Sequence, residues 1–187
     1  MKLLEINAIR NELSVNAKNG IGFLSSAWII WSLITIIFLQ PIEIYQKNVY
    51  MLFSTGLMFP LSIGISALVG ADWKLKHNPL GDLGLYLNLA QIVYFPILFW
   101  GMIKSPTEAI IFFSIITGAH FFPYGWFYRA KPYYVMAPVI SITIMVLGLY
   151  LGEEVLWPIP LSMVILLSVL ILWATIDFKK KAKTSKG

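Results

Sequence analysis

The stretch Ile21–Leu39, IGFLSSAWIIWSLITIIFL, decides the class of fold because it contains no charged residue. A helix rises about 1.5 Å per residue, so this stretch is long enough to cross a hydrocarbon core about 30 Å thick. Gln40 and Pro41 follow it instead of the small-residue cleavage site of a signal peptide. The stretch is therefore predicted to be an uncleaved transmembrane helix.

The composition of the whole chain is that of a membrane protein. Of its 187 residues, 58% are hydrophobic and 12% are charged, and the mean hydropathy is +0.77. An average soluble domain is about 45–50% apolar and about 25% charged, so a soluble fold could not bury this much apolar surface. There is no cysteine, and His77 and His120 are the two histidines. Disulfides and thiolate chemistry are excluded, and neither a metal site nor a cofactor is expected.

The same criterion of length and hydropathy predicts five further spans. They cover approximately residues 49–69, 84–103, 108–127, 133–151 and 156–176. The links between them are short and leave no room for a soluble domain. We therefore expect an all-α fold, a polytopic transmembrane helical bundle of six spans that forms a single domain over residues 21–176. Fewer spans would result if the fourth or the fifth were re-entrant.

The two ends of the chain are more polar than the spans. In residues 1–20, Leu3, Ile6, Ile9 and Leu13 recur at helical spacing, which suits an amphipathic helix on the membrane surface. An irregular polar leader fits the same residues equally well. Residues 177–187 form a basic tail, which is expected chiefly to set orientation and also to attract anionic lipid head groups. No other segment suits DNA or RNA, so no nucleic-acid partner is expected.

The distribution of lysine and arginine predicts the orientation. Twelve of the 14 basic residues lie before the first span, after the sixth, or in the second-to-third and fourth-to-fifth links. The two exceptions are Lys47 and Lys104. Cytoplasmic loops are enriched in basic residues, so both termini are predicted to be cytoplasmic.

Polar side chains inside spans are costly in lipid, and they are the first candidates for a site. Asn88 and Gln91 share one face of the third span, and Thr117, His120 and Tyr124 share one face of the fourth. Because the third span leaves the cytoplasm and the fourth returns to it, these residues lie at similar depth. They are predicted to line a cavity open to the cytoplasm, in which His120 could titrate near neutral pH.

The surroundings of this layer leave two interpretations open. Trp73 or Arg129, in the cytoplasmic links, could stand at the mouth of the cavity, or could simply anchor the helices at the interface. The polar side chains could also serve only to hydrogen-bond neighbouring helices, which we favour for Ser62 and Ser66 on the second span. Pro60 and Pro96 fall near mid-membrane, where a proline produces either an ordinary kink or the broken helix of a transporter site.

Two hypotheses about function follow. The first is a small-molecule or lipid binding protein, or a transporter, which at this size would act as a homodimer. The second is a non-catalytic membrane partner or assembly subunit. Sequence signatures of hydrolases, metalloproteases, nucleotide-binding proteins and potassium channels are absent, so an enzyme is not expected.

Two segments carry a resemblance to a known family. NPLGDL, residues 78–83, and GAHFFPYGWFY, residues 118–128, resemble the pattern of an uncharacterised bacterial family of six-span membrane proteins, the DUF7010 domain of unknown function. The resemblance extends over nearly the whole chain. It implies a location in the bacterial cytoplasmic membrane, and it implies no activity and no catalytic residue.

Overall fold

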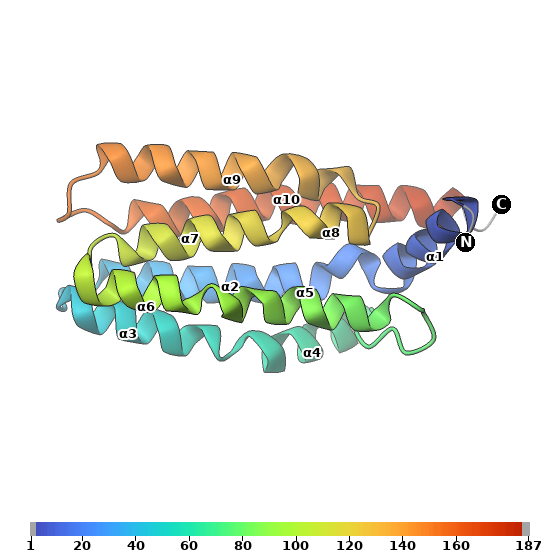
Figure 1. Ribbon diagram of the computed structural model, residues 1–187, viewed down its shortest axis with the longest axis horizontal. Helices are drawn as coiled ribbons and strands as arrows, with labels where there is room; N and C mark the ends of the chain where they lie inside the picture. Colours follow the sequence, from blue (N-terminus) through green and yellow to red (C-terminus); the bar gives the residue numbers. More distant parts are fainter. Residues whose placement is uncertain (1–2, 185–187) are drawn as a thin grey trace.

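The computed structural model describes residues 3–184, and this part of the chain is helical apart from short links (Figure 1). The elements are α1 (Leu3–Asn16), the 3-10 turn η1 (Lys18–Gly20), α2 (Ile21–Leu39), α3 (Ile44–Thr55), α4 (Met58–Val69), α5 (Gly81–Val93), α6 (Phe95–Lys104), α7 (Ala109–His120), α8 (Phe122–Phe127), α9 (Lys131–Tyr150) and α10 (Pro158–Thr184). The long helices run side by side, and α1 lies at the same end of the bundle as the C-terminal end of α10 (Figure 1).

The described residues contain five segments that are long and apolar enough to cross a membrane. They are Lys18–Leu39, Gly81–Lys104, Ala109–Phe127, Lys131–Tyr150 and Pro158–Thr184. A sixth results if α3 and α4, which meet at 44°, form one broken span. The predicted all-α, multi-pass architecture is confirmed, with five to six spans. The bent pair falls where the second span was predicted and fits either one broken span or a re-entrant segment. The fourth and fifth predicted spans, for which re-entry was the alternative, are long enough to cross.

Three of the predicted spans are interrupted, and each interruption lies beside a proline. Pro60 is the third residue of α4, and Pro96 and Pro123 are the second residues of α6 and α8. Proline has no backbone N–H, and its ring clashes with the carbonyl four residues earlier, so a helix tends to end before it. Pro138 lies inside α9 without interrupting it. Pro60 and Pro96 therefore stand at breaks between helices.

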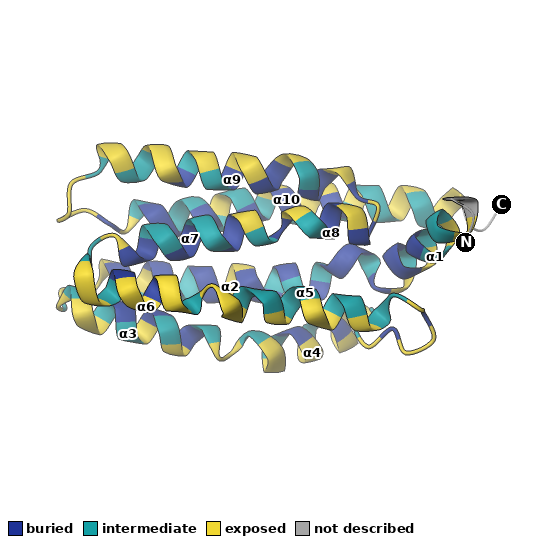
Figure 2. Cartoon of the chain, in the orientation of Figure 1, coloured by how far each residue is buried: buried dark blue, intermediate teal, exposed yellow. Residues whose placement is uncertain are grey.

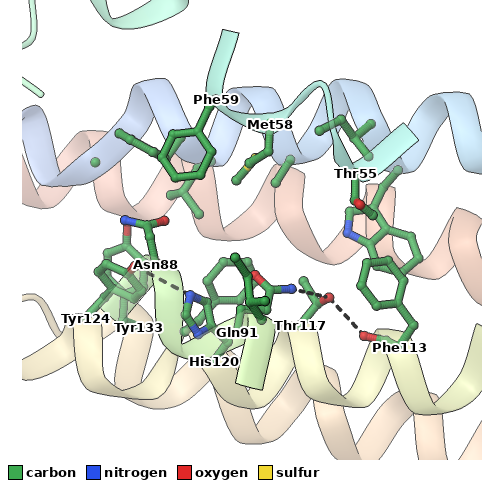
Figure 3. A pocket seen from close by; sticks show the side chains of 18 of the residues that line it. Thr55, Met58, Phe59, Asn88, Gln91, Phe113, Thr117, His120, Tyr124 and Tyr133 are labelled. Carbon is green, nitrogen blue, oxygen red and sulfur yellow. Dashed lines mark hydrogen bonds between the residues drawn. The ribbon is translucent and has the colours of Figure 1, made fainter. Parts of the chain in front are cut away.

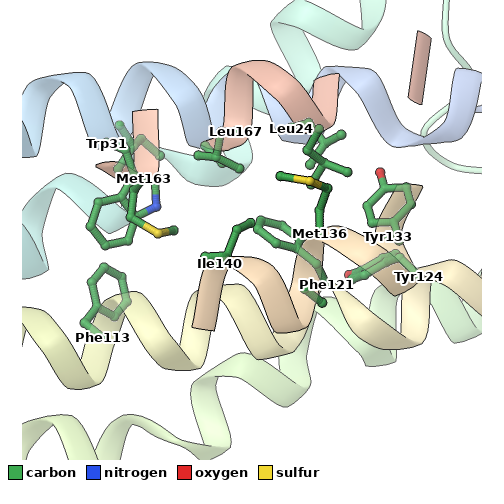
Figure 4. Close-up of a cluster of buried hydrophobic side chains, with 14 of the residues drawn as sticks. Leu24, Trp31, Phe113, Phe121, Tyr124, Tyr133, Met136, Ile140, Met163 and Leu167 are labelled. Atoms are coloured by element: carbon green, nitrogen blue, oxygen red, sulfur yellow. The ribbon is translucent and has the colours of Figure 1, made fainter. Parts of the chain in front are cut away.

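The core is formed mainly by α2, α7, α9 and α10 (Figure 4). Trp31 of α2 stacks on Phe113 of α7, with ring centroids 5.2 Å apart and planes at 25°. Ile140 of α9 and Met163 and Leu167 of α10 are fully buried around this pair. By contrast, none of the 13 residues of α5 is buried (Figure 2). The bundle therefore combines a tightly packed half with one loosely packed wall.

α1 packs against the end of the bundle. Arg10 donates from Nε to the Trp126 carbonyl at 2.6 Å, and its guanidinium lies 4.5 Å from the centroid of the Trp126 ring. Burial lowers the pKa of Arg10. Asn78 donates to the Ile9 carbonyl at 3.0 Å. At the other terminus, α10 continues to Thr184, so the basic segment 177–184 is helical.

Candidate functional site

A cavity of about 310 Å³ lies inside the bundle, between α2, the α3–α4 break, α5 and α7–α8 (Figure 3). Asn88 and Gln91 of α5 line it, and so do His120 of α7 and Tyr124 of α8. The structure thus brings together the four residues that the sequence indicated on the third and fourth spans. Counting residues from the ends of the two spans was sufficient to predict that these side chains lie at the same depth in the bundle.

The amide side chains in the cavity use their donors on the protein itself. Asn88 donates from Nδ2 to the Gly84 carbonyl at 2.9 Å, and Gln91 donates from Nε2 to Thr117 Oγ1 at 3.3 Å. Thr117 in turn donates to the Phe113 carbonyl at 2.9 Å. Among the described residues, nothing donates to the side-chain oxygens of Asn88 and Gln91. The cavity therefore offers two amide oxygens as acceptors.

His120, the last residue of α7, lies beside Tyr124 of α8. His120 Nε2 lies 3.5 Å from the Tyr124 hydroxyl, and the two rings are 5.4 Å apart at 71°. This separation is long for a hydrogen bond. The tyrosine therefore constrains the histidine weakly, and the imidazole keeps hydrogen-bonding capacity for another partner.

All three interrupted spans contribute residues at their breaks. Gly56 comes from the α3–α4 break, Ile92 and Phe95 flank the α5–α6 break, and Phe121 is the residue between α7 and α8. Because Pro60 has no N–H, it cannot supply the Gly56 carbonyl with its usual helical partner. The α3–α4 junction is bent by 44°, whereas Tyr94 and Phe121 keep right-handed helical backbone at the other two junctions. Residues from all three junctions line the one cavity.

The cavity wall is aromatic and uncharged. Among the described residues that line it, none is Asp, Glu, Lys or Arg. Nine are aromatic: Phe23, Trp31, Phe59, Phe95, Phe113, Phe121, Tyr124, Tyr128 and Tyr133. Ligand sites in proteins are commonly lined by apolar and aromatic side chains with a few polar groups that fix orientation, and this wall has that composition.

A buried polar network closes the cavity at the end nearest α1. Asn19, whose side chain is fully buried, accepts from Ser14 Oγ at 2.5 Å and donates from Nδ2 to Asp177 at 2.9 Å. Lys181 Nζ lies 2.6 Å from Asp177 Oδ2 and 3.1 Å from Ser14 Oγ. Tyr133, which lines the cavity, donates its hydroxyl to the Asn19 carbonyl at 2.6 Å. Packed side chains thus occupy the end at which the sequence predicted an opening.

This network was not anticipated from the sequence, although two signals for it exist. Lys18, Asn19 and Gly20 have φ angles of 50°, 53° and 73°, and Asn and Gly are the residues that most readily adopt left-handed backbone. Asp177 is the first charged residue after the sixth predicted span, and Lys181 follows it at the i,i+4 spacing of an ion pair. Neither signal reveals that these residues meet.

The exposed part of the cavity lining lies on the side of the bundle. Phe59 at the start of α4 is 39% exposed and Ile92 near the end of α5 is 53% exposed. α4 packs on α2, whereas α5 packs on α7 and α8. The cavity is therefore open between α4 and α5.

Trp73 and Arg129 do not line this cavity. Arg129 has a φ of 50° and donates to Asn11 Oδ1 at 3.2 Å, so it faces a shallow hollow between α1 and α10. Trp73 lies in the link between α4 and α5 with Lys74 Nζ 5.2 Å from its ring centroid. The left-handed turn after α8 directs Arg129 toward α1, away from the α4–α5 side.

Ser62 and Ser66 are buried in α4 and are not part of the cavity lining. Ser62 donates to the Phe59 carbonyl at 3.0 Å. A Cβ added to Gly22 of α2 would lie 3.1 Å from the Ser66 Cα, so the two helices approach each other closely here. Both serines are thus packed inside the bundle, but the hydrogen bond of Ser62 lies within its own helix, whereas one that joins neighbouring helices had been expected.

Comparison with known proteins gives one result for the whole chain. A sequence model described as a family of unknown function, DUF7010, matches residues 6–177 and so covers both segments that carried the resemblance. No curated protein and no solved structure matches the chain significantly. Within residues 3–184, no group of three or more His, Cys, Asp or Glu side chains could hold a metal ion.

Proposed function

This chain belongs to the DUF7010 family, a family of unknown function, and we propose that it binds a small molecule or a lipid in the cavity beside α5. It is a multi-pass membrane protein. We further propose a bacterial cytoplasmic membrane with both termini inside, because 12 of its 14 basic residues fall on the side of the termini.

The observation that carries this proposal is that residues at three helix junctions, one of them bent by 44°, line one uncharged cavity. Protein interiors are close-packed and contain few voids larger than a water molecule. Transporters commonly bind their substrates near the midplane at discontinuous helices. A cavity of about 310 Å³ at such breaks, with the free amide oxygens of Asn88 and Gln91 in its wall, suits a ligand better than it suits packing.

A catalytic role is not proposed. General acid–base catalysis needs a titratable side chain within reach of the reacting group. His120 is the single histidine among the described residues of the lining, which include no Asp, Glu, Lys or Arg. It has no carboxylate beside it in the cavity. Transport remains part of the proposal, since α5, which carries Asn88 and Gln91, has no buried residue to hold it in place.

The test is a thermal-shift screen of the purified protein in detergent against lipids, amphiphiles, cationic drugs and metabolites, with matched variants. A ligand at 100 times its Kd stabilises by about 2.7 kcal/mol, which raises the Tm by roughly 5–10 °C for a chain of this size. The shift should be lost in Gln91→Leu and His120→Ala. It should persist in Gln40→Leu, because Gln40 is exposed at the end of α2 and lies outside the cavity. A panel without hits, or hits unaffected by both cavity variants, would overturn the proposal.

A second candidate function rests on the exposed face of α6. Phe99, Trp100 and Ile103 are all exposed there, and the α5–α6 span is the least buried of the candidate spans. A second copy or another membrane protein could cover this face in an assembly. Cross-linking from a single thiol at position 100 in native membranes tests it. A specific cross-linked partner, together with a ligand screen without hits, would favour the assembly role.

A further inference from the structure

We infer that the cavity receives a neutral, lipophilic molecule carrying a hydrogen-bond donor, which enters sideways from the bilayer between α4 and α5. This inference rests on the proposed binding function and names its ligand class and entry route.

The first step concerns charge. An ion that leaves water loses its hydration, and this loss is recovered only where the site supplies opposite charge or many polar contacts. Among the described residues, the cavity lining includes no Asp, Glu, Lys or Arg. The aromatic side chains of the lining include the stacked rings of Trp31 and Phe113. A neutral molecule with a ring or another flat apolar part satisfies this wall. An anion meets no positive charge there, and a cation gains only about 0.5–2 kcal/mol from an aromatic face, less than the several kcal/mol per ion that desolvation costs.

The second step concerns hydrogen bonding. Asn88 and Gln91 each donate one N–H, to Gly84 and Thr117, and no described residue donates to either side-chain oxygen. Each amide therefore offers the cavity its oxygen and its second N–H. The Gly56 carbonyl, at the edge of the cavity, lacks its helical donor because Pro60 has no N–H. A hydroxyl or N–H on the ligand meets these acceptors, while a ligand with acceptors alone would leave them unpaired.

The third step concerns the route. The end nearest α1 is closed, because Tyr133 and Asn19 are buried and joined by a hydrogen bond of 2.6 Å. Phe59 and Ile92, on α4 and α5, are the exposed large side chains of the lining. Ile92 is 11 residues beyond Gly81 where α5 begins, or roughly 16 Å along the helix at 1.5 Å per residue. That depth is near the middle of a hydrocarbon core about 30 Å thick, so the opening faces lipid chains.

The wall that would move is α5. Near its start it is held closely, because a Cβ added to Gly84 would lie 2.8 Å from the Phe127 ring. None of its residues is buried, and its far end at Ile92 is exposed. α5 continues through Tyr94 into α6, which is held closely again at Gly101, where an added Cβ would lie 2.7 Å from the Phe112 ring. Outward bowing of the span around Ile92 would widen the opening while the contacts at Gly84 and Gly101 stay in place.

Ligand class is tested with four probes that share one ring system. They are 2-naphthol, 2-methoxynaphthalene, naphthalene-2-sulfonate and (2-naphthylmethyl)trimethylammonium, each titrated against the protein in nanodiscs. Binding to Gln91→Leu is subtracted to remove partition into lipid. We expect saturable binding of 2-naphthol, binding of 2-methoxynaphthalene about 2–10-fold weaker through loss of one hydrogen bond, and none of the two ions. Cavity binding of an ion would refute this inference and leave the proposed function standing. Absence of binding by all four would refute this inference alone, because the proposed function is decided by its own screen of lipids, amphiphiles, drugs and metabolites.

The route is tested with introduced thiols, because the chain contains no cysteine. Ile92→Cys places a thiol at the opening, and Leu68→Cys places a control thiol on α4, where Leu68 is 87% exposed and outside the cavity. Each is modified with the lipophilic reagent N-(1-pyrenyl)maleimide. We expect the adduct at position 92 to abolish 2-naphthol binding, the adduct at position 68 to leave it unchanged, and 2-naphthol to slow labelling at 92. Unchanged binding after modification at 92 would refute sideways entry, and so would rapid labelling there by a charged, water-soluble thiosulfonate.

Discussion

Asn19→Ala is predicted to destabilise the folded protein substantially, through two effects that a second variant separates. The Asn19 side chain accepts from Ser14 and donates to Asp177 and to the Ala174 carbonyl, at 2.5, 2.9 and 3.0 Å. Its backbone is left-handed, with a φ of 53°. Alanine removes all three bonds and in addition adopts this backbone poorly. Asn19→Gly removes the same bonds but tolerates the backbone.

The magnitude follows from these contacts. A neutral hydrogen bond contributes about 0.5–1.5 kcal/mol net, and one to a charged group about 1.5–3 kcal/mol. Ser14 and Asp177 keep Lys181 as a partner, so the lower part of the sum applies and Asn19→Gly should cost about 2–4 kcal/mol. The left-handed backbone adds about 1–2 kcal/mol for alanine. At roughly 2–4 °C per kcal/mol, the Tm should fall by about 4–16 °C for glycine and further for alanine.

The assay is thermal unfolding in one detergent, followed by tryptophan fluorescence at a fixed scan rate. Asn16→Ala is the matched control, because Asn16 is exposed at the end of α1, and it should stay within about 0.5 kcal/mol of wild type. Values for Asn19→Ala and Asn19→Gly that both equal wild type would refute the network. If the two variants had equal Tm values, both below that of wild type, the argument from backbone strain would be refuted and the argument from hydrogen bonds would stand.

Three further variants test other parts of the structure. Gly84→Ala should lower the Tm, because overpacking against the buried Phe127 ring costs about 1–3 kcal/mol. Gly64→Ala, which meets nothing within 4 Å, should raise it through about 1 kcal/mol of helix propensity. A Tm for Gly84→Ala that rises as it does for Gly64→Ala would contradict the close α5–α8 contact. Lys181→Met should lower the free energy of unfolding by about 1–3 kcal/mol, since it removes the ion pair with Asp177 and two hydrogen bonds to backbone carbonyls. The control Lys179→Met, at an exposed position, should change it by less than about 0.5 kcal/mol. Equal effects of the two variants would show that the contacts of Lys181 do not stabilise the fold. Thr117→Val should leave the free energy of unfolding within about 1 kcal/mol of wild type. It frees the Gln91 N–H that binds Thr117, in addition to the other N–H of the same amide, so 2-methoxynaphthalene should gain affinity relative to 2-naphthol. An unchanged ratio would mean that Gln91 does not face the ligand.

The helical framework was largely predictable, because hydropathy over about 20 residues is a strong signal. The bounds predicted for the first span, Ile21–Leu39, are those of α2. The effect of individual prolines was not predictable. Pro60 and Pro138 both lie inside apolar stretches, yet the first stands at a break and the second lies within a continuous helix. That outcome depends on how neighbouring helices hold the chain on either side of the proline, which a single sequence does not contain.

The depth at which the candidate residues lie was predictable from the sequence, but the direction in which their side chains face was not. Counting residues from the span ends was enough to group Asn88 and Gln91 with His120 and Tyr124, and the cavity unites them. The rotation of each helix about its axis was not predicted, so Arg129 was expected near the cavity and instead contacts Asn11 on α1. For the same reason the direction of the opening was not predictable: it was expected at the end of the bundle, and the exposed large side chains of the lining, Phe59 and Ile92, lie on α4 and α5.

α5, the loosely packed wall of the bundle, carries two amide side chains, those of Asn88 and Gln91, although polar side chains are costly in a membrane. If Asn88 and Gln91 served only to join helices, they would be expected to spend both donors and acceptors across an interface. Asn88 instead donates within its own helix, to Gly84, and the Gln91 contact with Thr117 is a long one at 3.3 Å. α5 thus has weak polar ties to its neighbours and no buried side chain. A helix that keeps two costly amides without using them for packing is better explained by an occupant of the cavity, whose donor completes their hydrogen bonding when it binds.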